Sequence, residues 1–295
     1  MDPKNNSGDN TNNRTLVVHL ARWADGLQAF QRFVSSYRQH PAGAPHDLFV
    51  AFKGFGDKSE TLELWIALLV DIDYGMMCLE DVDFDIGSYC RVAERYPERS
   101  ILVLNSNSVL LVDNWLALLL LHANEHTLVG ATGSWENSKL LYLLTSRYVG
   151  MLPDIHFVRW FARLLSATVR WQNPHLRTNA ILFPPDFFPS ITLPRKICDK
   201  SQVHSCESGF KGISRQARKR GFKLVVADRN GAAYCWKDWP KSHTFRIGEQ
   251  EGLIVGDKQT NLYAEGSSVV RDLLSKYAWG LEYAKYVEQP RPKKT

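Results

Sequence analysis

The sequence predicts an α/β protein in which a mainly parallel central sheet is flanked by helices, all within a single large domain. Short apolar segments alternate with segments of helical apolar spacing, which is the pattern of βαβ units. In the stretch ILVLNSNSVLLVDNW (101–115), a short apolar run leads into four small polar residues. Open α/β sheets bind ligands where such strands end. The length of 295 residues suits one large domain or two small ones.

The first half of the chain alternates regularly. The spacing of Leu27, Phe30, Phe33, Val34 and Tyr37 is typical of an amphipathic helix, which the cluster PAGAP ends. The expected strands are Thr15–Leu20, Asp47–Phe52, Gly75–Leu79 and Ile101–Leu104. The expected helices are Gly26–His40, Thr61–Val70, Gly87–Tyr96 and one that begins at Asp113.

The pattern changes beyond Gly130. Further strands are expected at Val129–Gly133, Thr178–Phe183 and Phe222–Ala227. Further helices are expected at Leu140–Trp171, broken at Pro153, and at Cys206–Gly221 and Ser267–Tyr283. We expect Tyr234–Thr260 to be a loop, and its density of aromatic and charged residues suggests a lid that closes on a ligand. The residues that suggest this lid are Trp236, Trp239, His243 and Arg246.

These segments divide the chain into four parts. Residues 1–14 are polar and are expected to form a disordered tail. Residues 15–130 form the first half of the domain and residues 131–266 the second half, followed by a C-terminal helix and basic tail over 267–295.

Composition narrows the class of protein. The net charge of +5 is mild, and no sequence-specific nucleic-acid motif is present, so we expect no nucleic-acid partner. Five cysteines without a C-x-x-C pair fit a reducing compartment, and the N-terminus lacks the apolar core of a signal peptide. We therefore expect a cytoplasmic protein. The segment Ile155–Trp171 carries Arg159, Arg163 and Arg170 on one helical face; it is either an ordinary amphipathic helix or a peripheral contact with the inner face of a membrane.

Four blocks carry a resemblance to a known family, over roughly residues 15–265. They are the alternating first half with its acidic segment EDVDFD, ILVLNSNSVLLVDNW followed by LVGATGSWE, NPHLRTNAILF, and CESGFKGISRQARKRGFKLVV. In this order and spacing they resemble GT-A glycosyltransferases, most closely the bacterial family-2-like enzymes of surface polysaccharide synthesis. The resemblance implies transfer of a sugar from a nucleotide-diphosphate donor to a glycan or lipid-linked acceptor, with inversion.

The resemblance implies a nucleotide site after the third strand, at Asp83 and Asp85. Carboxylates there can accept hydrogen bonds from the base or the ribose. Arg22 and Lys53 end the first and second strands, and either cation could pair with a diphosphate. For each of these residues the alternative is an ordinary surface charge.

Asn105 and Asn107 stand where the family usually keeps the carboxylates of its Asp-x-Asp motif. Amide oxygens carry no charge, so a divalent ion such as Mg²⁺ or Mn²⁺ would be held weakly. No cofactor is firmly implied, and the metal ligands stay unknown. Either fixed cations such as Arg22, Lys53 or Arg246 neutralise the leaving diphosphate, or a metal uses other ligands. The remaining alternative is that NSNS is only a polar turn.

Glu207 lies in the block that resembles the family's catalytic Glu-Asp motif, where a carboxylate deprotonates the acceptor hydroxyl. Ser208 replaces the second carboxylate of that motif, so Glu207 is the candidate base, unless it only caps a helix. His175, Arg177 and Asn179 could donate to a sugar or phosphate, and Trp135 with Glu136 could form an acceptor wall. The alternative function is a non-catalytic nucleotide- or sugar-binding protein on the same fold.

Overall fold

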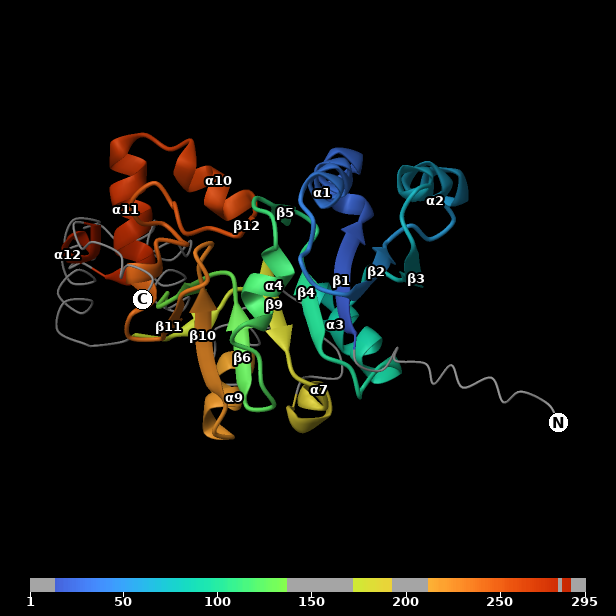
Figure 1. Ribbon diagram of the computed structural model, residues 1–295. Coiled ribbons are helices and arrows are strands. Elements are labelled where there is room, and N and C mark those ends of the chain that lie inside the picture. Colours follow the sequence, from blue (N-terminus) through green and yellow to red (C-terminus); the bar gives the residue numbers. More distant parts are fainter. Residues whose placement is uncertain (1–13, 137–171, 193–211, 281–282, 288–295) are drawn as a thin grey trace, which may run out of the picture.

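The computed structural model describes residues 14–136, 172–192, 212–280 and 283–287 (Figure 1). Its centre is an eight-stranded sheet in the order β11-β10-β6-β9-β4-β1-β2-β3. The half of the sheet that ends at β3 contains β1 (Thr15–Arg22), β2 (His46–Lys53), β3 (Tyr74–Leu79) and β4 (Ile101–Leu104). The half that ends at β11 contains β6 (Thr127–Gly130), β9 (Ala180–Phe183), β10 (Lys223–Ala227) and β11 (Ala233–Cys235).

The sheet is mainly parallel, which confirms the predicted architecture. β9 is antiparallel to both of its neighbours, β4 and β6, and β11 is antiparallel to β10. The other strand pairs are parallel. The sheet runs without a break from the first half of the chain into the second, so both halves build one edge at the carboxyl ends of the parallel strands.

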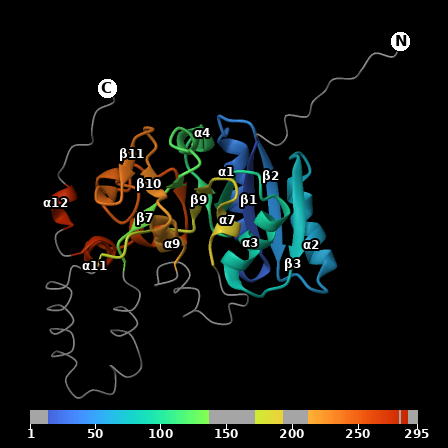
Figure 2. The same cartoon turned by 90° about the horizontal axis from the view of Figure 1, so that it is seen from below.

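Both faces of the sheet are buried, which explains why its strands read as continuous apolar runs. In β1, Leu16, Val18 and Leu20 belong to one core cluster, and Val17 and Ala21 belong to the other. Figure 2 shows α3, α7 and α9 along one face of the sheet and α1 and α4 along the other. These helices are α1 (Leu27–Gln39), α3 (Phe84–Arg95), α4 (Trp115–Leu120), α7 (Phe187–Ser190) and α9 (Ile213–Lys219).

The remaining helices lie around the ends of the sheet. They are α2 (Ser59–Ile66), α10 (Lys258–Ala264), α11 (Ser268–Trp279) and α12 (Ala284–Val287), with 3-10 turns at Trp23–Asp25, Ala67–Leu69 and Trp239–Ser242. In Figure 1 the chain leaves β1 on the side of the molecule where α1, β5, β12 and α10 lie. β5 (Val109–Leu110) pairs with β12 (Val255–Gly256), so the C-terminal part of the chain returns to the strand that follows Asn105–Ser108.

The region 234–260 is mostly irregular, as predicted, but Trp239 and Phe245 in it are buried and do not form an exposed lid. It contains β12, one 3-10 turn and the start of α10, and Trp239, Phe245 and Ile247 are fully buried in it. A Cβ atom at Gly133 would lie 2.5 Å from the Trp239 ring, so the indole is packed tightly against β7 (Gly133–Ser134). The aromatic residues of this region therefore build core and do not form an exposed lid.

Some predicted features fall outside the described residues. These include the helix Leu140–Trp171 with its arginine face, residue Glu207, and the first part of the helix predicted at Cys206–Gly221. Within the described part of the chain, no helix is both long enough and apolar enough to cross a membrane.

Candidate functional site

The candidate site begins where β1, β2 and β3 end. Arg22 and Lys53 are register partners at the last positions of β1 and β2. Asp81 follows β3, and its two carboxylate oxygens accept from Arg22 Nε and Nη2, each at 2.9 Å. This bidentate pair fixes the guanidinium plane at the carboxyl edge of the sheet.

Lys53 is a fully buried cation next to this pair. Burial lowers the pKa of its ammonium group, and the negative charges of Asp85 and Asp81 oppose that change. Burial likewise raises the pKa of the Asp85 carboxyl, against the effect of Lys53 and Arg22. The structure therefore brings Arg22, Lys53 and Asp85 together, as the sequence predicted, and adds Asp81, which the sequence did not single out.

Asp83 has a more structural environment. It begins α3 with a φ of +60°, and its carboxylate pairs with Arg91 on the same helix at 2.8 Å. A Cβ atom at Gly87 would lie only 2.3 Å from Asp83 Cβ, so the glycine makes room for this side chain. Of the two predicted nucleotide carboxylates, Asp85 is thus the better placed for a ligand.

The turn after β4 is fixed by its own side chains. Asn105 Oδ1 accepts from the backbone N–H of Asn107 at 2.9 Å and from Ser108 Oγ at 3.1 Å. Ser106 Oγ donates to Asp25 Oδ2 at 2.7 Å, which ties this turn to the 3-10 turn after β1. The amide of Asn105 is therefore used to shape the turn, and the turn adjoins the site of Arg22 and Lys53.

The amides of the turn after β4 are poor ligands for a resident metal ion. Divalent cations prefer charged oxygen ligands, and the two amides supply none. Within the described ranges, no three His, Cys, Asp or Glu side chains are grouped as metal ligands. Fixed cations are therefore the groups that this edge offers to a diphosphate.

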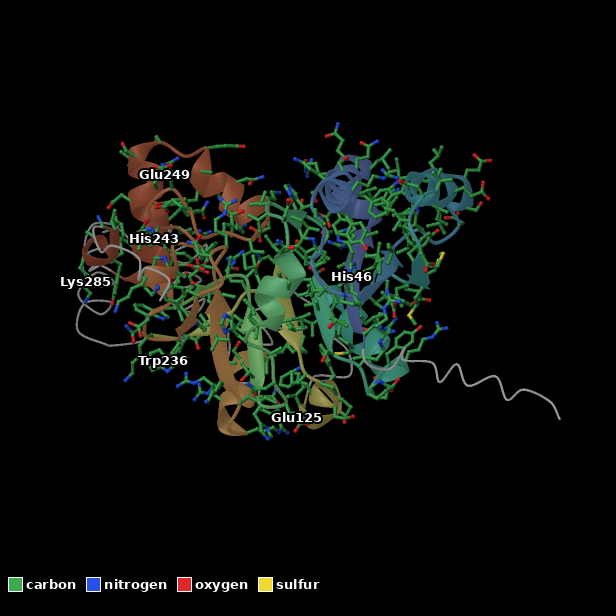
Figure 3. The ribbon with its side chains drawn as sticks, in the orientation of Figure 1. His46, Glu125, Trp236, His243, Glu249 and Lys285 are labelled. Atoms are coloured by element: carbon green, nitrogen blue, oxygen red, sulfur yellow. The ribbon has the colours of Figure 1, made fainter. Side chains whose placement is uncertain are left out.

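Arg246 lies elsewhere, in a second cluster on the far side of β4. Its Nη1 donates to Glu136 and its Nη2 to Gln259 Oε1 at 2.7 Å. Arg177 Nη2 donates to Asp257 Oδ2 at 3.1 Å in the same cluster. In Figure 3, His243, three residues before Arg246, lies on the side of the molecule with Glu249 and Lys285, whereas His46, the first residue of β2, lies among the strands of the other half of the sheet. The partners of Arg246 thus differ from those of the other predicted diphosphate cations, Arg22 and Lys53.

Asn179 connects the second cluster with the turn after β4. Its backbone oxygen accepts from Ser108 Oγ at 2.6 Å, and its Oδ1 accepts from Thr132 Oγ1. Its Nδ2 donates to the Val255 carbonyl at 2.9 Å. One buried asparagine thereby contacts the turn after β4 through its backbone, and Thr132 and β12 through its side chain.

Several residues of the site were not among the predicted ones. Asp25 and Asp81 follow β1 and β3 within three residues, so their position after a strand is a signal that the sequence did carry. Asp257 and Gln259 gave no such signal, because Asp257 has the sequence position of an ordinary helix N-cap. The structure shows that it is one, since its Oδ1 accepts from the backbone N–H groups of Gln259 and Thr260.

Comparison with known proteins gives matches only among solved structures. No family model matches, and no curated protein matches. The chain is similar to the mannosyltransferase Ktr4p from S. cerevisiae (13% identity, TM-score 0.39, 72% of this chain and 66% of that chain). It is also similar to the mannosyltransferase PcManGT from Pyrobaculum calidifontis in complex with GDP-Man and Mn²⁺ (9%, 0.43, 77% and 60%). A third structure is the galactosyltransferase LgtC with donor and acceptor sugar analogues (10%, 0.37, 72% and 73%).

All three are sugar transferases, the class of enzyme that the sequence resembles. The chain spans less than two thirds of the length of PcManGT and just under two thirds of Ktr4p.

Proposed function

We propose that this protein is a glycosyltransferase that moves a sugar from a nucleotide-diphosphate donor to a glycan or lipid-linked acceptor. The observation that carries the proposal is the pair of cations, Arg22 and Lys53, held by carboxylates at the carboxyl edge of the sheet beside the Asn105–Ser108 turn. Preorganised cations stabilise the charge that develops on a leaving diphosphate.

In this proposal the nucleotide lies over the ends of β1 to β3. Asp85 accepts from the base or ribose, while Arg22 and Lys53 neutralise the diphosphate. The turn with Asn105 and Asn107 faces the donor sugar. The acceptor oxygen then attacks the anomeric carbon as the nucleoside diphosphate leaves, and Glu207 takes the acceptor proton. Because Arg246 lies in the second cluster, we assign it to the acceptor side.

Nucleotide-sugar binding and turnover test this function directly. Thermal shift with UDP-, GDP- and dTDP-sugars is expected to identify one nucleotide that stabilises the protein, and the matching donor should then be hydrolysed slowly or transferred. No stabilisation by any nucleotide would contradict the proposal. Binding without hydrolysis or transfer would favour the alternative, a non-catalytic nucleotide- or sugar-binding protein, which the use of the Asn105 amide in shaping its own turn supports.

Asp85→Ala is expected to weaken nucleoside-diphosphate binding by about 1–3 kcal/mol, the usual cost of leaving buried donors unpaired. The physical reason is that Asp85 is a partly buried acceptor whose charge acts on both Lys53 and Arg22. Isothermal titration calorimetry measures the change. Asp57→Ala is the matched control, since the Asp57 side chain is 99% exposed. Equal affinities of the two variants would move the nucleotide site away from Asp85.

Turnover is expected to depend weakly on divalent metal, because Asn105 and Asn107 bring no negative charge to the turn. Activity measured in excess EDTA should stay close to that of the untreated protein, and Arg22→Ala should reduce turnover more than EDTA does. If EDTA abolishes activity and Mn²⁺ restores it, a metal must bind to other ligands, and Asp25, which accepts from Ser106 of the turn, is the first to test.

A further inference from the structure

Two arginines of the second cluster lie over the same buried ring. The Cζ atom of Arg177 is 4.0 Å from the centroid of Phe245, and that of Arg246 is 4.7 Å from it. Phe245 is fully buried and Arg246 is only 4% exposed. Placing two cations in this position is costly, because each loses hydration and each repels the other.

The backbone holds Arg246 in an uncommon conformation. Its φ is +47°, in the left-handed region that costs a non-glycine residue about 1 kcal/mol or more. Its N–H donates to Gln250 Oε1 at 3.0 Å, and its carbonyl accepts from Ser275 Oγ at 2.8 Å, so contacts on both sides enforce this geometry. Strain that is enforced in this way is typical of functional sites.

The hydrogen bonds of the two guanidinium groups are incomplete. Arg177 uses Nη2 for Asp257, and Arg246 uses both Nη atoms for Glu136 and Gln259. The Nε atoms of both arginines are buried and have no hydrogen-bond partner within the described part of the chain. Buried N–H groups are nearly always paired in folded proteins, so these two point to an acceptor that a ligand supplies.

The positive charge of Arg177 is also only partly neutralised. Its partner Asp257 caps α10, where the other carboxylate oxygen accepts two backbone N–H groups at 2.9 Å. The partial positive charge of a helix N-terminus interacts with the negative charge of such a carboxylate, which leaves less of it to neutralise Arg177. Arg177 therefore retains an electrostatic preference for a further anion.

We propose that Arg177 and Arg246 bind an anionic group on the acceptor sugar, either a carboxylate or a phosphate ester. This inference rests on the proposed transferase function. It places the anion beside the donor turn, because Arg177 lies two residues before Asn179, which accepts from Ser108. Guanidinium groups bind both kinds of oxyanion through paired N–H donors, whereas a neutral sugar offers no such partner.

Ligand-observed NMR with simple sugars tests the proposal on the full chain. The probes are methyl glucuronide, which carries a carboxylate, glucose 1-phosphate, which carries a phosphate ester, and methyl glucoside, which is neutral. At least one anionic probe is expected to bind ten or more times more tightly than the neutral one. Inorganic phosphate should compete with it, and the preferred probe identifies which oxyanion the acceptor carries.

Arg177→Gln is expected to reduce the affinity for the anionic probe at least tenfold, and Arg177→Lys should reduce it less. Arg271→Gln is the matched control, since Arg271 is an arginine that pairs with the exposed Glu249 on the surface. Phosphate competition on the unmodified protein is repeated with the stabilising nucleoside diphosphate at saturation, which occupies the site of Arg22 and Lys53. A probe that phosphate still displaces then lies outside that site, and this measurement decides the question even if Arg177→Gln does not fold.

Equal binding of neutral and anionic sugars, or no effect of phosphate, would overturn the proposal. Binding of inorganic phosphate without either anionic sugar would also overturn it, because the site would not then recognise an acceptor. Nucleotide titrations on the same samples test the transferase function separately, so failure of one proposal is distinguishable from failure of the other.

Discussion

Replacing Glu207 by glutamine is expected to lower turnover by a factor on the order of 10² or more while leaving donor binding unchanged. The amide keeps the size of the side chain and removes its ability to accept a proton. Glu207 lies outside the described residues, and its assignment comes from the sequence block that resembles the family's catalytic motif. The described acceptor-side carboxylates support it indirectly. Glu136 is paired with Arg246, and Asp257 is paired with Arg177 and caps α10, so neither is free to act as a base.

Single-turnover rates at saturating donor measure this effect without interference from product release. Glu136→Gln is the informative comparison, because it removes the carboxylate that pairs with Arg246 in the second cluster. If Glu207→Gln turns over at nearly the normal rate and Glu136→Gln does not, the base is Glu136 and Arg246 is the group that positions it.

The protein is expected to lose about 2 kcal/mol of stability between pH 7 and pH 5 because of His19, and His19→Leu should not show this loss. His19 is fully buried in β1, with its ring stacked on Phe33 at 3.6 Å between centroids. Burial lowers the pKa of this imidazole from 6.5 to about 3. Below pH 6.5 the unfolded chain binds a proton that the folded protein does not bind, so stability falls as the pH falls and levels off below about pH 3.

Urea unfolding at pH 7, 6 and 5 measures this dependence. The free energy of unfolding of the unmodified protein should fall more steeply than that of His19→Leu. His126→Gln, at an exposed histidine, should keep the full slope. Parallel slopes for the unmodified protein and His19→Leu would show that this histidine finds a partner for its proton in the folded state.

The sequence predicted those features that depend on neighbouring residues. β1 was predictable because its residues from Thr15 to Ala21 are all buried and nearly all apolar. The segment of β9 was also predicted as a strand, but its antiparallel position between β4 and β6 was not. That position depends on contacts such as the one between Ser108 and Asn179, which are 71 residues apart. Pairings over such separations leave no periodic signal in a sequence.

The candidate site shows the same division. Arg22, Lys53 and Asp85 were predicted because each follows a recognisable strand, and parallel strands bring their carboxyl ends to one edge. Asp25 also follows a strand, but its contact with Ser106, 81 residues away, could not be predicted from the sequence. The sequence analysis grouped Arg246 with the diphosphate cations, because the aromatic density around it suggested a lid; in the structure its side chain instead pairs with Glu136 and Gln259. Burial of Phe245 and Trp239 instead fixes that region against the second cluster.

The hydrogen bonds of Asn179 have a thermodynamic consequence. Because this residue contacts the donor-side turn through Ser108 and the opposite side of the edge through Thr132 and Val255, neither side can shift without disturbing the other. Under the proposed function, linkage requires any coupling between the two sides to be mutual: whatever factor an acceptor adds to the affinity for donor, the donor adds to the affinity for acceptor. Asn179→Ala is expected to reduce that shared factor toward one, so that two sites on one sheet would bind as though they belonged to different proteins.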